Sequence, residues 1–278
     1  MDAHAGSHRS PHGDERTVTR RGPAPPAART ATIPPAAASP TTSPSTALTR
    51  RPPALVAVGH GSRDPRAARV LADLAAQVRI LRPGTEVEVG YVELNRPLVG
   101  EVLAGLAGEV VVVPLLLGRG HHVKHDLPYA LAAAAHLRGA VAAPLGPHPL
   151  LARALHDRLA QAGWTASGQA VVLAAAGSRD PEPARDTERT AALLAARLGG
   201  VPVVPAYASA ARPTVPQAVA ELAGRGLREI AVASCFTAPG RFAAQSAAAA
   251  PWIVSAPLGA HPALAELVLR RYDEACAG

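Results

Sequence analysis

The sequence contains a long internal repeat, and no other feature limits the possible folds as strongly. The segment GSRDPRAAR at residues 61–69 returns as GSRDPEPAR at 177–185, a shift of 116 residues. The segment APLGPHPLLARAL at 143–155 returns as APLGAHPALAELV at 256–268, a shift of 113 residues. Repetition on this scale predicts two similar lobes of about 105 residues each, joined by a hinge near residues 163–169.

Within each copy, short apolar runs alternate with alanine-rich stretches. In the first copy we expect strands at 54–58, 86–92, 109–117 and 140–144, and helices near 66–81, 97–107, 127–137 and 149–162. Strands that alternate with helices form βαβ units around a parallel sheet. The sequence therefore predicts an α/β protein with two tandem lobes related by duplication, each a parallel four-stranded sheet flanked by helices.

Residues 1–53 differ in composition from the rest of the chain. They hold 10 of the 28 prolines, many Ala, Ser and Thr residues, and no apolar periodicity. This composition is typical of a disordered tail. The expected division is a Pro/Ala/Arg-rich tail at 1–53, an N-terminal lobe at 54–162 and a C-terminal lobe at 169–278.

Charge and cysteine content argue against several classes of protein. The tail contributes about +4 of the formal net charge of +7, but it has no interleaved aromatic residues and no nucleic-acid-binding motif. The chain has no apolar run long enough to span a bilayer and no signal-peptide core at its N-terminus. Cys235 and Cys276 are too few for a disulfide framework. We expect a cytoplasmic protein with two free thiols, Cys235 packed in a core, and no nucleic-acid or membrane partner.

The repeated GSRDP segment has a structural explanation. Asp64 and Pro65 suit the N-cap and the first position of a helix, and Asp180 and Pro181 suit the same positions in the second copy. What the two copies share is therefore explained in part by helix initiation. Residues that only one copy holds need another explanation.

The two copies differ in their histidines. Where the first copy reads VGHGSRD, the second reads AAAGSRD, so that Ala176 replaces His60. The segment 115–131 reads LLLGRGHHVKHDLPYAL, whereas its counterpart at 234–250 has no histidine. These histidines follow the first and third strands, and ligands bind at the carboxyl ends of strands in open parallel sheets. We expect His60 to face a histidine of the 121–125 loop across a cleft.

Paired histidines of this kind suggest a transition-metal site. Imidazole suits Fe, Co, Ni, Cu and Zn, whereas Mg requires oxygen donors. Two neutral imidazoles on rigid strand ends hold a divalent ion weakly and leave open coordination positions. Such a site is suited to passing a metal on.

Three motifs in order, VGHGSRD, YVELNRP and HVKHDLP, together with the duplication, resemble the type II chelatases of the sirohydrochlorin chelatase and cobaltochelatase family. The resemblance covers about residues 54–278 and identifies His60 and His122 as the facing active-site histidines and metal ligands. Leu127 stands where the family motif commonly has isoleucine. The additional His121 and His125 surround the matching histidine, and His121 is a competing candidate ligand.

The resemblance implies a lyase that inserts Fe²⁺, which we favour, or Co²⁺ into sirohydrochlorin, a tetrapyrrole with eight carboxylates, for sirohaem or cobalamin synthesis. The metal is a substrate, and no tightly bound cofactor is expected. Single-lobe members of the family pair as dimers, so this chain is expected to act as a monomeric, fused pseudo-dimer.

Several other polar residues are candidates for roles at the same site. Glu93 is a candidate to accept pyrrole protons or to orient a histidine. Four cations at the same sheet edge are candidates to bind substrate carboxylates: Arg63, Arg96, Arg119 and Lys124. Asp126 either orients a histidine or caps the helix starting at Leu127, and we favour capping. His148 and His261 occur in both copies and are expected to be structural.

Three rival functions remain open at this point. Glycine loops after parallel strands often bind phosphate or nucleotides, but GHGSRD is neither GxGxxG nor a P-loop. An α/β hydrolase using Ser62 would need the GxSxG elbow, which is missing. A non-enzymatic carrier of metal or tetrapyrrole would share every residue with the chelatase and differ only in turnover.

Overall fold

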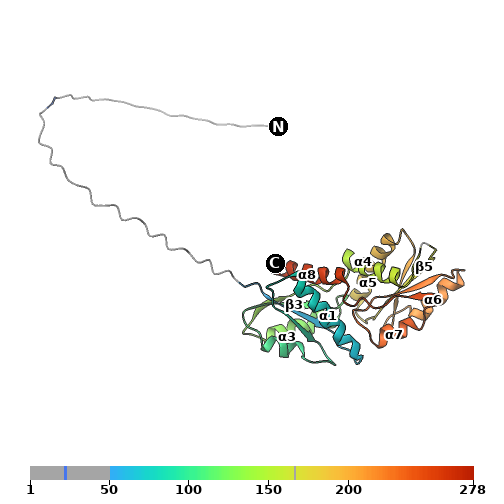
Figure 1. Cartoon of the computed structure of the whole chain (residues 1–278), viewed down its shortest axis with the longest axis horizontal. Helices are drawn as coiled ribbons and strands as arrows, with labels where there is room; N and C mark the ends of the chain where they lie inside the picture. Colours follow the sequence, from blue (N-terminus) through green and yellow to red (C-terminus); the bar gives the residue numbers. More distant parts are fainter. Residues whose placement is uncertain (1–21, 24–50, 166) are drawn as a thin grey trace, which may run out of the picture. The chain divides into compact units, whose positions relative to one another are not determined.

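The structure, a computed structural model, describes residues 22–23, 51–165 and 167–278. The prediction of a disordered tail therefore falls almost entirely outside the described residues. The described chain contains two four-stranded parallel sheets of the same topology (Figure 1). The fold class predicted from the sequence is confirmed.

The first sheet has the strand order β2-β1-β3-β4. Its strands are β1 (Ala54–Gly59), β2 (Val87–Tyr91), β3 (Glu109–Pro114) and β4 (Arg138–Val141), and the accompanying helices are α1 (Pro65–Leu81), α2 (Val99–Ala104), the π-helix η1 (His122–Asp126), α3 (Leu127–Ala133) and α4 (Pro149–Gln161). Every residue of β1 is buried, because this central strand has a neighbour on each side and helices over both faces. That environment explains its continuous apolar run.

The second sheet repeats this arrangement with the order β6-β5-β7-β8. Its strands are β5 (Ala170–Ala175), β6 (Val203–Tyr207), β7 (Ile230–Ser234) and β8 (Ile253–Val254), and its helices are α5 (Pro181–Arg197), α6 (Val215–Gly224), α7 (Arg241–Ala247) and α8 (Pro262–Ala277). The central strand β5 is buried along its whole length, as β1 is.

The repeated GSRDP segments start helices, as predicted. The carboxylate of Asp64 accepts a hydrogen bond from the backbone N–H of Arg66, and that of Asp180 accepts one from the N–H of Glu182. Pro65 occupies the first position of α1. These contacts satisfy N–H groups that the first turn of a helix leaves without partners.

The segment between α3 and β4 departs from the prediction. Helix α3 ends at Ala133 rather than near 137, and β4 covers 138–141 rather than 140–144. A turn closes the helix, with the N–H of Leu137 bonded to the carbonyl of Ala134. Gly139 then pairs so closely with β3 that a Cβ would lie 2.2 Å from the carbonyl oxygen of Val110. The early start of β4 thus depends on a glycine whose strand propensity is low.

The last helix of each half packs on the other half. Helix α8 contacts α1 and β3 of the first half, whereas α4 contacts α5 and β7 of the second (Figure 1). One apolar core therefore holds buried side chains of both halves, including Leu55, Leu155, Leu173 and Leu267. Consistent with this exchange, the described residues from 51 onward cluster as one compact unit.

Polar contacts fix the exchanged helices in place. Arg82 at the end of α1 forms two hydrogen bonds of 2.8 Å with the carboxylate of Asp273 on α8. Arg271 on α8 donates to the carbonyl of Pro144, and Arg158 on α4 donates to that of Leu258. Each donor bonds across the boundary between the sequence halves, so these contacts orient α4 and α8 as well as hold them.

His148 and His261 are structural, as predicted. The Nδ1 atom of His148 accepts the N–H of Leu150, and that of His261 accepts the N–H of Ala263, so each histidine caps an exchanged helix. Burial lowers the pKa of both imidazoles. A lowered pKa favours the neutral form, which this cap requires.

The prediction for Cys235 is also confirmed. It is buried, and burial raises the pKa of its thiol to about 12, whereas Cys276 is exposed. Across the described ranges, we find no helix with the length and apolarity needed to cross a lipid bilayer.

Candidate active site

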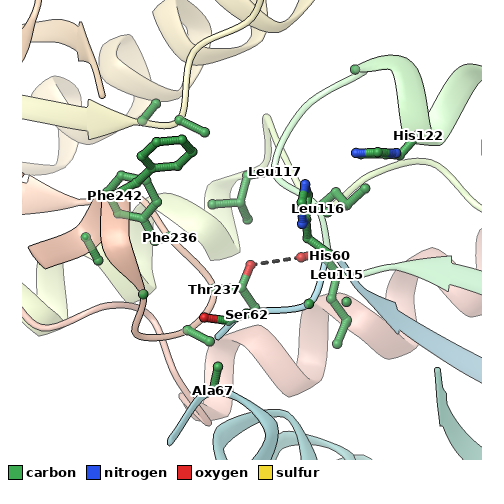
Figure 2. A pocket seen from close by; sticks show the side chains of 18 of the residues that line it. His60, Ser62, Ala67, Leu115, Leu116, Leu117, His122, Phe236, Thr237 and Phe242 are labelled. Carbon is green, nitrogen blue, oxygen red and sulfur yellow. Dashed lines mark hydrogen bonds between the residues drawn. The ribbon is translucent and has the colours of Figure 1, made fainter. Parts of the chain in front are cut away.

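A cavity of about 910 Å³ lies between the two halves, at the carboxyl ends of their central strands. The first half lines it with residues 59–64, 93–95 and 115–118, and the second half lines it with residues 175–178 and 235–243, among others. Two hydrogen bonds join its walls, from Thr237 Oγ1 to the carbonyl of Leu115 (2.8 Å, Figure 2) and from Ser62 Oγ to the carbonyl of Pro239 (3.4 Å). This volume is sufficient for a large organic ligand.

His60 and His122 meet at this cavity. His60 follows β1 and His122 begins the π-helix after β3, and these two strands are hydrogen-bonded neighbours. The ring centroids are 4.9 Å apart and the ring planes are almost perpendicular, at 86° (Figure 2). Their side chains are 48% and 31% exposed, so both are accessible to a ligand.

Each of these imidazoles has a carboxylate at its Nδ1 atom. His122 Nδ1 is 2.5 Å from Asp126 Oδ2, and His60 Nδ1 is 3.6 Å from Glu93 Oε1. A carboxylate at one ring nitrogen fixes the tautomer and leaves the other nitrogen free to bind a metal. His122 therefore has a hydrogen-bonded outer-shell partner of the kind found around metal-binding histidines, whereas Glu93 lies near His60 beyond hydrogen-bond distance.

The backbone holds Glu93 beside His60. The N–H of Glu93 donates to the carbonyl of His60 at 3.1 Å. Gly61 has φ +104°, and a Cβ there would lie 1.8 Å from the carbonyl oxygen of Glu93. A left-handed conformation and a close backbone approach both require glycine in this turn.

The family is decided by comparison with known sequences. A family model described as CbiX matches residues 54–162 and, a second time, residues 170–275. The chain belongs to the CbiX family. The predicted resemblance to sirohydrochlorin chelatases is confirmed by this match and by the relatives described next.

Known relatives include chelatases named for iron and for cobalt. A sirohydrochlorin ferrochelatase of Bacillus subtilis is 28% identical over 177 residues, which cover 61% of this chain and 68% of the relative. A sirohydrochlorin cobaltochelatase of Methanopyrus kandleri is 40% identical over 82 residues, which cover 28% of this chain and only 57% of the relative. The solved structure of SirB from Bacillus subtilis with Fe³⁺ matches with a TM-score of 0.67 and 26% identity, over 81% of this chain and 96% of that one.

The structure of this CbiX chain corrects the preferred role of Asp126. We expected it to cap α3, but it makes no side-chain cap and has helical backbone angles itself. The π-helix continues directly into α3, with the N–H of Leu127 bonded to the carbonyl of His122, so no free helix start exists at this point. The carboxylate points to His122 instead, and a π-helix at such a site is a recurring feature of functional positions.

Of the two additional histidines, His121 lies beside this carboxylate. His121 Nε2 is 3.7 Å from Asp126 Oδ1, and the ring of His121 lies 4.7 Å from that of His125 and 6.3 Å from that of His122. His121 also lines the cavity. Among the described residues, no group of three or more His, Cys, Asp or Glu side chains has the geometry to hold a metal ion. The site thus offers an imidazole pair with open positions.

The four predicted cations separate into two groups. Arg63 lines the cavity, and we find no carboxylate partner for it within the described ranges. Arg96 pairs with Glu101, Arg119 with Asp186, and Lys124 with Asp180 and Glu182. None of these three is among the cavity-lining residues. The structure therefore brings Arg63, but not the other three, to the cavity together with the histidines.

Helix α5 of the second half holds the loop that carries His122. The buried carboxylate of Asp186 accepts hydrogen bonds from the side chain of Arg119, at 2.7 and 3.0 Å, and from its backbone N–H. Lys124 donates to Asp180 at 2.6 Å. The first of these ion pairs raises the pKa of Arg119, and the second lowers the pKa of Asp180. Two cations expected to bind substrate thus anchor the histidine loop to the other half.

Sequence reasoning missed three residues on the second wall of the cavity, namely Phe236, Arg241 and Phe242. A signal for them was available. Pro114 and Ser234 pair with equivalent residues of the central strands, Val58 and Ala174, so His122 and Phe242 occupy the same place in their repeats.

A test of the Asp126 contact follows from this geometry. We expect Asp126→Asn to weaken Co²⁺ binding about 10-fold and Asp126→Ala to weaken it up to about 100-fold, because loss of an outer-shell carboxylate lowers ligand basicity and orientation. Titration with Co²⁺ measures this effect. The exposed Asp73 on α1 provides the control Asp73→Asn, and equal affinities in all four proteins would contradict the assigned contact.

Proposed function

We propose that the chain is a sirohydrochlorin chelatase that inserts a divalent metal, Fe²⁺ or Co²⁺, into its tetrapyrrole substrate. The observation that carries this proposal is the facing pair His60 and His122, the latter hydrogen-bonded to Asp126, at a cavity between two lobes of the CbiX family. Fe²⁺ is favoured, because the Bacillus subtilis relatives that match the larger part of the chain are named for a ferrochelatase or contain Fe³⁺.

The residues of the chain suit the steps that insertion needs. One divalent ion enters the macrocycle, and two pyrrole N–H protons leave it. His60 and His122 bind the ion through the nitrogens not turned to carboxylates, and their open coordination positions allow its transfer. Glu93, whose side chain is 53% exposed, accepts a proton next to His60 or keeps that ring oriented.

Substrate carboxylates require cations that are free to bind them. Arg63 meets this condition at the cavity, and its guanidinium can hold a carboxylate with two hydrogen bonds. Because both cavity walls belong to the same chain, a single copy is sufficient for the proposed reaction.

The structure supplies arguments against two of the rival functions. The N-terminus of α1, where a phosphate would bind, is already capped by the carboxylate of Asp64, which would repel an anion. Ser62 Oγ bonds to the N–H of Asp64 and to the carbonyl of Pro239, and within the described residues we find no histidine hydrogen-bonded to it as a base. A hydrolase would need such a base.

The decisive experiment separates an enzyme from a carrier. Purified chain is mixed anaerobically with metal-free sirohydrochlorin and Fe²⁺ or Co²⁺, and the absorbance of the macrocycle is followed. Conversion of many equivalents of tetrapyrrole per chain is the expected result. Binding of one equivalent without turnover would identify a carrier, and affinity for a nucleotide but not for the tetrapyrrole would favour the phosphate-binding alternative.

A further inference from the structure

The second wall of the cavity is aromatic. The whole sequence contains two phenylalanines, and both of them, Phe236 and Phe242, line this cavity. Each is only half-buried, so both rings keep accessible surface, although Phe236 also packs against the apolar core under β5 and β7. A chain with 3% aromatic residues thus places its phenylalanines where a ligand would lie.

One of these rings stands where the first half has a site histidine. Phe242 occupies the place of His122 near the start of α7, and Ala176 occupies the place of His60 after β5. Figure 2 shows Phe236 and Phe242 at the side of the cavity opposite the two imidazoles. The duplicated site has therefore lost both imidazole ligands and gained an apolar, aromatic surface that faces the remaining pair.

A cation accompanies the aromatic wall. The guanidinium carbon of Arg241 lies 5.3 Å from the ring centroid of Phe242, and Arg241 lines the cavity. Its side chain is exposed, and in the described chain we find no carboxylate paired with it. The wall thus combines aromatic rings with a cation, placed over the ring of Phe242, that can bind an anionic group.

We propose that Phe236 and Phe242 form a stacking face for the flat conjugated macrocycle, with Arg241 binding one of its carboxylates. The metal then reaches the macrocycle from the histidine side alone. This inference rests on the proposed chelatase function and extends it, because it assigns substrate binding to the half of the chain that has no site histidines. Aromatic rings stack on extended π-systems with offset faces, and the phenylalanine rings themselves offer no competing metal ligand.

Substitutions that remove the ring but keep apolar bulk test the stacking face. We expect Phe242→Leu and Phe236→Leu each to weaken binding of metal-free sirohydrochlorin about 3- to 10-fold, because each loses one aromatic contact. Phe242→Trp retains a ring and should keep most of the affinity. Macrocycle fluorescence in an anaerobic titration gives the dissociation constants, and Tyr129→Ala, at an aromatic residue that is 78% exposed on α3, is the matched control.

A second readout separates stacking from general damage to the fold. Affinity for Co²⁺ alone should be unchanged in both leucine variants, because neither residue contacts the histidine pair. In turnover assays the KM for sirohydrochlorin should rise by the same factor as its dissociation constant. Arg241→Met should likewise weaken substrate binding, and Arg241→Lys should restore part of it.

The possible failures are distinguishable. If the unmodified chain neither binds nor converts sirohydrochlorin, the proposed function fails and this inference fails with it. If the unmodified chain turns over but Phe242→Leu and Phe236→Leu keep their affinity and KM within twofold, the chelatase stands and the stacking face is wrong. Loss of Co²⁺ binding in the leucine variants would also overturn the inference, because it would show that these residues act through the metal site.

Discussion

Replacing His122 with alanine is expected to reduce metal insertion by roughly 100- to 10,000-fold, the range over which a positioned imidazole contributes to catalysis. The variant loses half of the imidazole pair and leaves Asp126 without its partner at 2.5 Å. His60→Ala should have an effect of similar size, because the two rings lie 4.9 Å apart and we propose that they bind one ion together. For the same reason the double variant should be little worse than either single one.

Initial rates of insertion with Fe²⁺ and with Co²⁺ provide the measurement. The matched control is His136→Ala, since His136 is an exposed histidine away from the cavity. Sirohydrochlorin affinity, measured without metal, should stay near that of the unmodified chain, because the stacking face and Arg63 are intact. If His60→Ala and His122→Ala insert metal as fast as the control, neither residue belongs to the active site.

The second large effect concerns stability and comes from the exchanged helices. Leu267 on α8 and Leu155 on α4 are both fully buried, so replacement of either one by alanine should cost about 2–5 kcal/mol in the free energy of unfolding. The distribution of the damage is the informative part. Because α8 packs on β3 and α4 packs on β7, Leu267→Ala should loosen the first sheet and Leu155→Ala the second.

Denaturant titration gives the loss of stability, and native-state amide hydrogen exchange locates it. In Leu267→Ala the amides of β1 and β3 should exchange faster than those of β5 and β7, and the order should reverse in Leu155→Ala. Ala133, exposed at the end of α3, provides a surface control as Ala133→Ser. If each substitution instead accelerated amide hydrogen exchange in the sheet of its own sequence half, the packing of α4 and α8 on the opposite halves would be contradicted.

The sheets and the histidine pair could be predicted from the sequence, because each depends on residues of one half of the chain. His60 and His122 follow two strands that are neighbours in the sheet, and parallel strands place their carboxyl ends at one edge. The short apolar runs between alanine-rich stretches predicted the strands, and the internal repeat predicted two lobes. Each of these inferences needed only one half of the chain.

The features that escaped prediction depend on contacts between the halves. Arg119 and Lys124 looked like free cations because their partners, Asp186 and Asp180, lie on a helix of the other half. Nothing in the local pattern of α8 indicates which sheet it covers, since its apolar face suits either one. The role of Asp126 escaped for a different reason, because a π-helix changes which side chains lie together and has no clear sequence signature.

The exchange of α4 and α8 also makes the covalent link between the halves dispensable for their association. If a protease cut the backbone between Gly163 and Gln169, each fragment would still bury a helix in the core of the other. The fragments would remain together and keep both walls of the cavity, because each exchanged helix stays packed on the opposite half. The packing of the exchanged helices would thus hold the two halves together even after the peptide bond between them is cleaved.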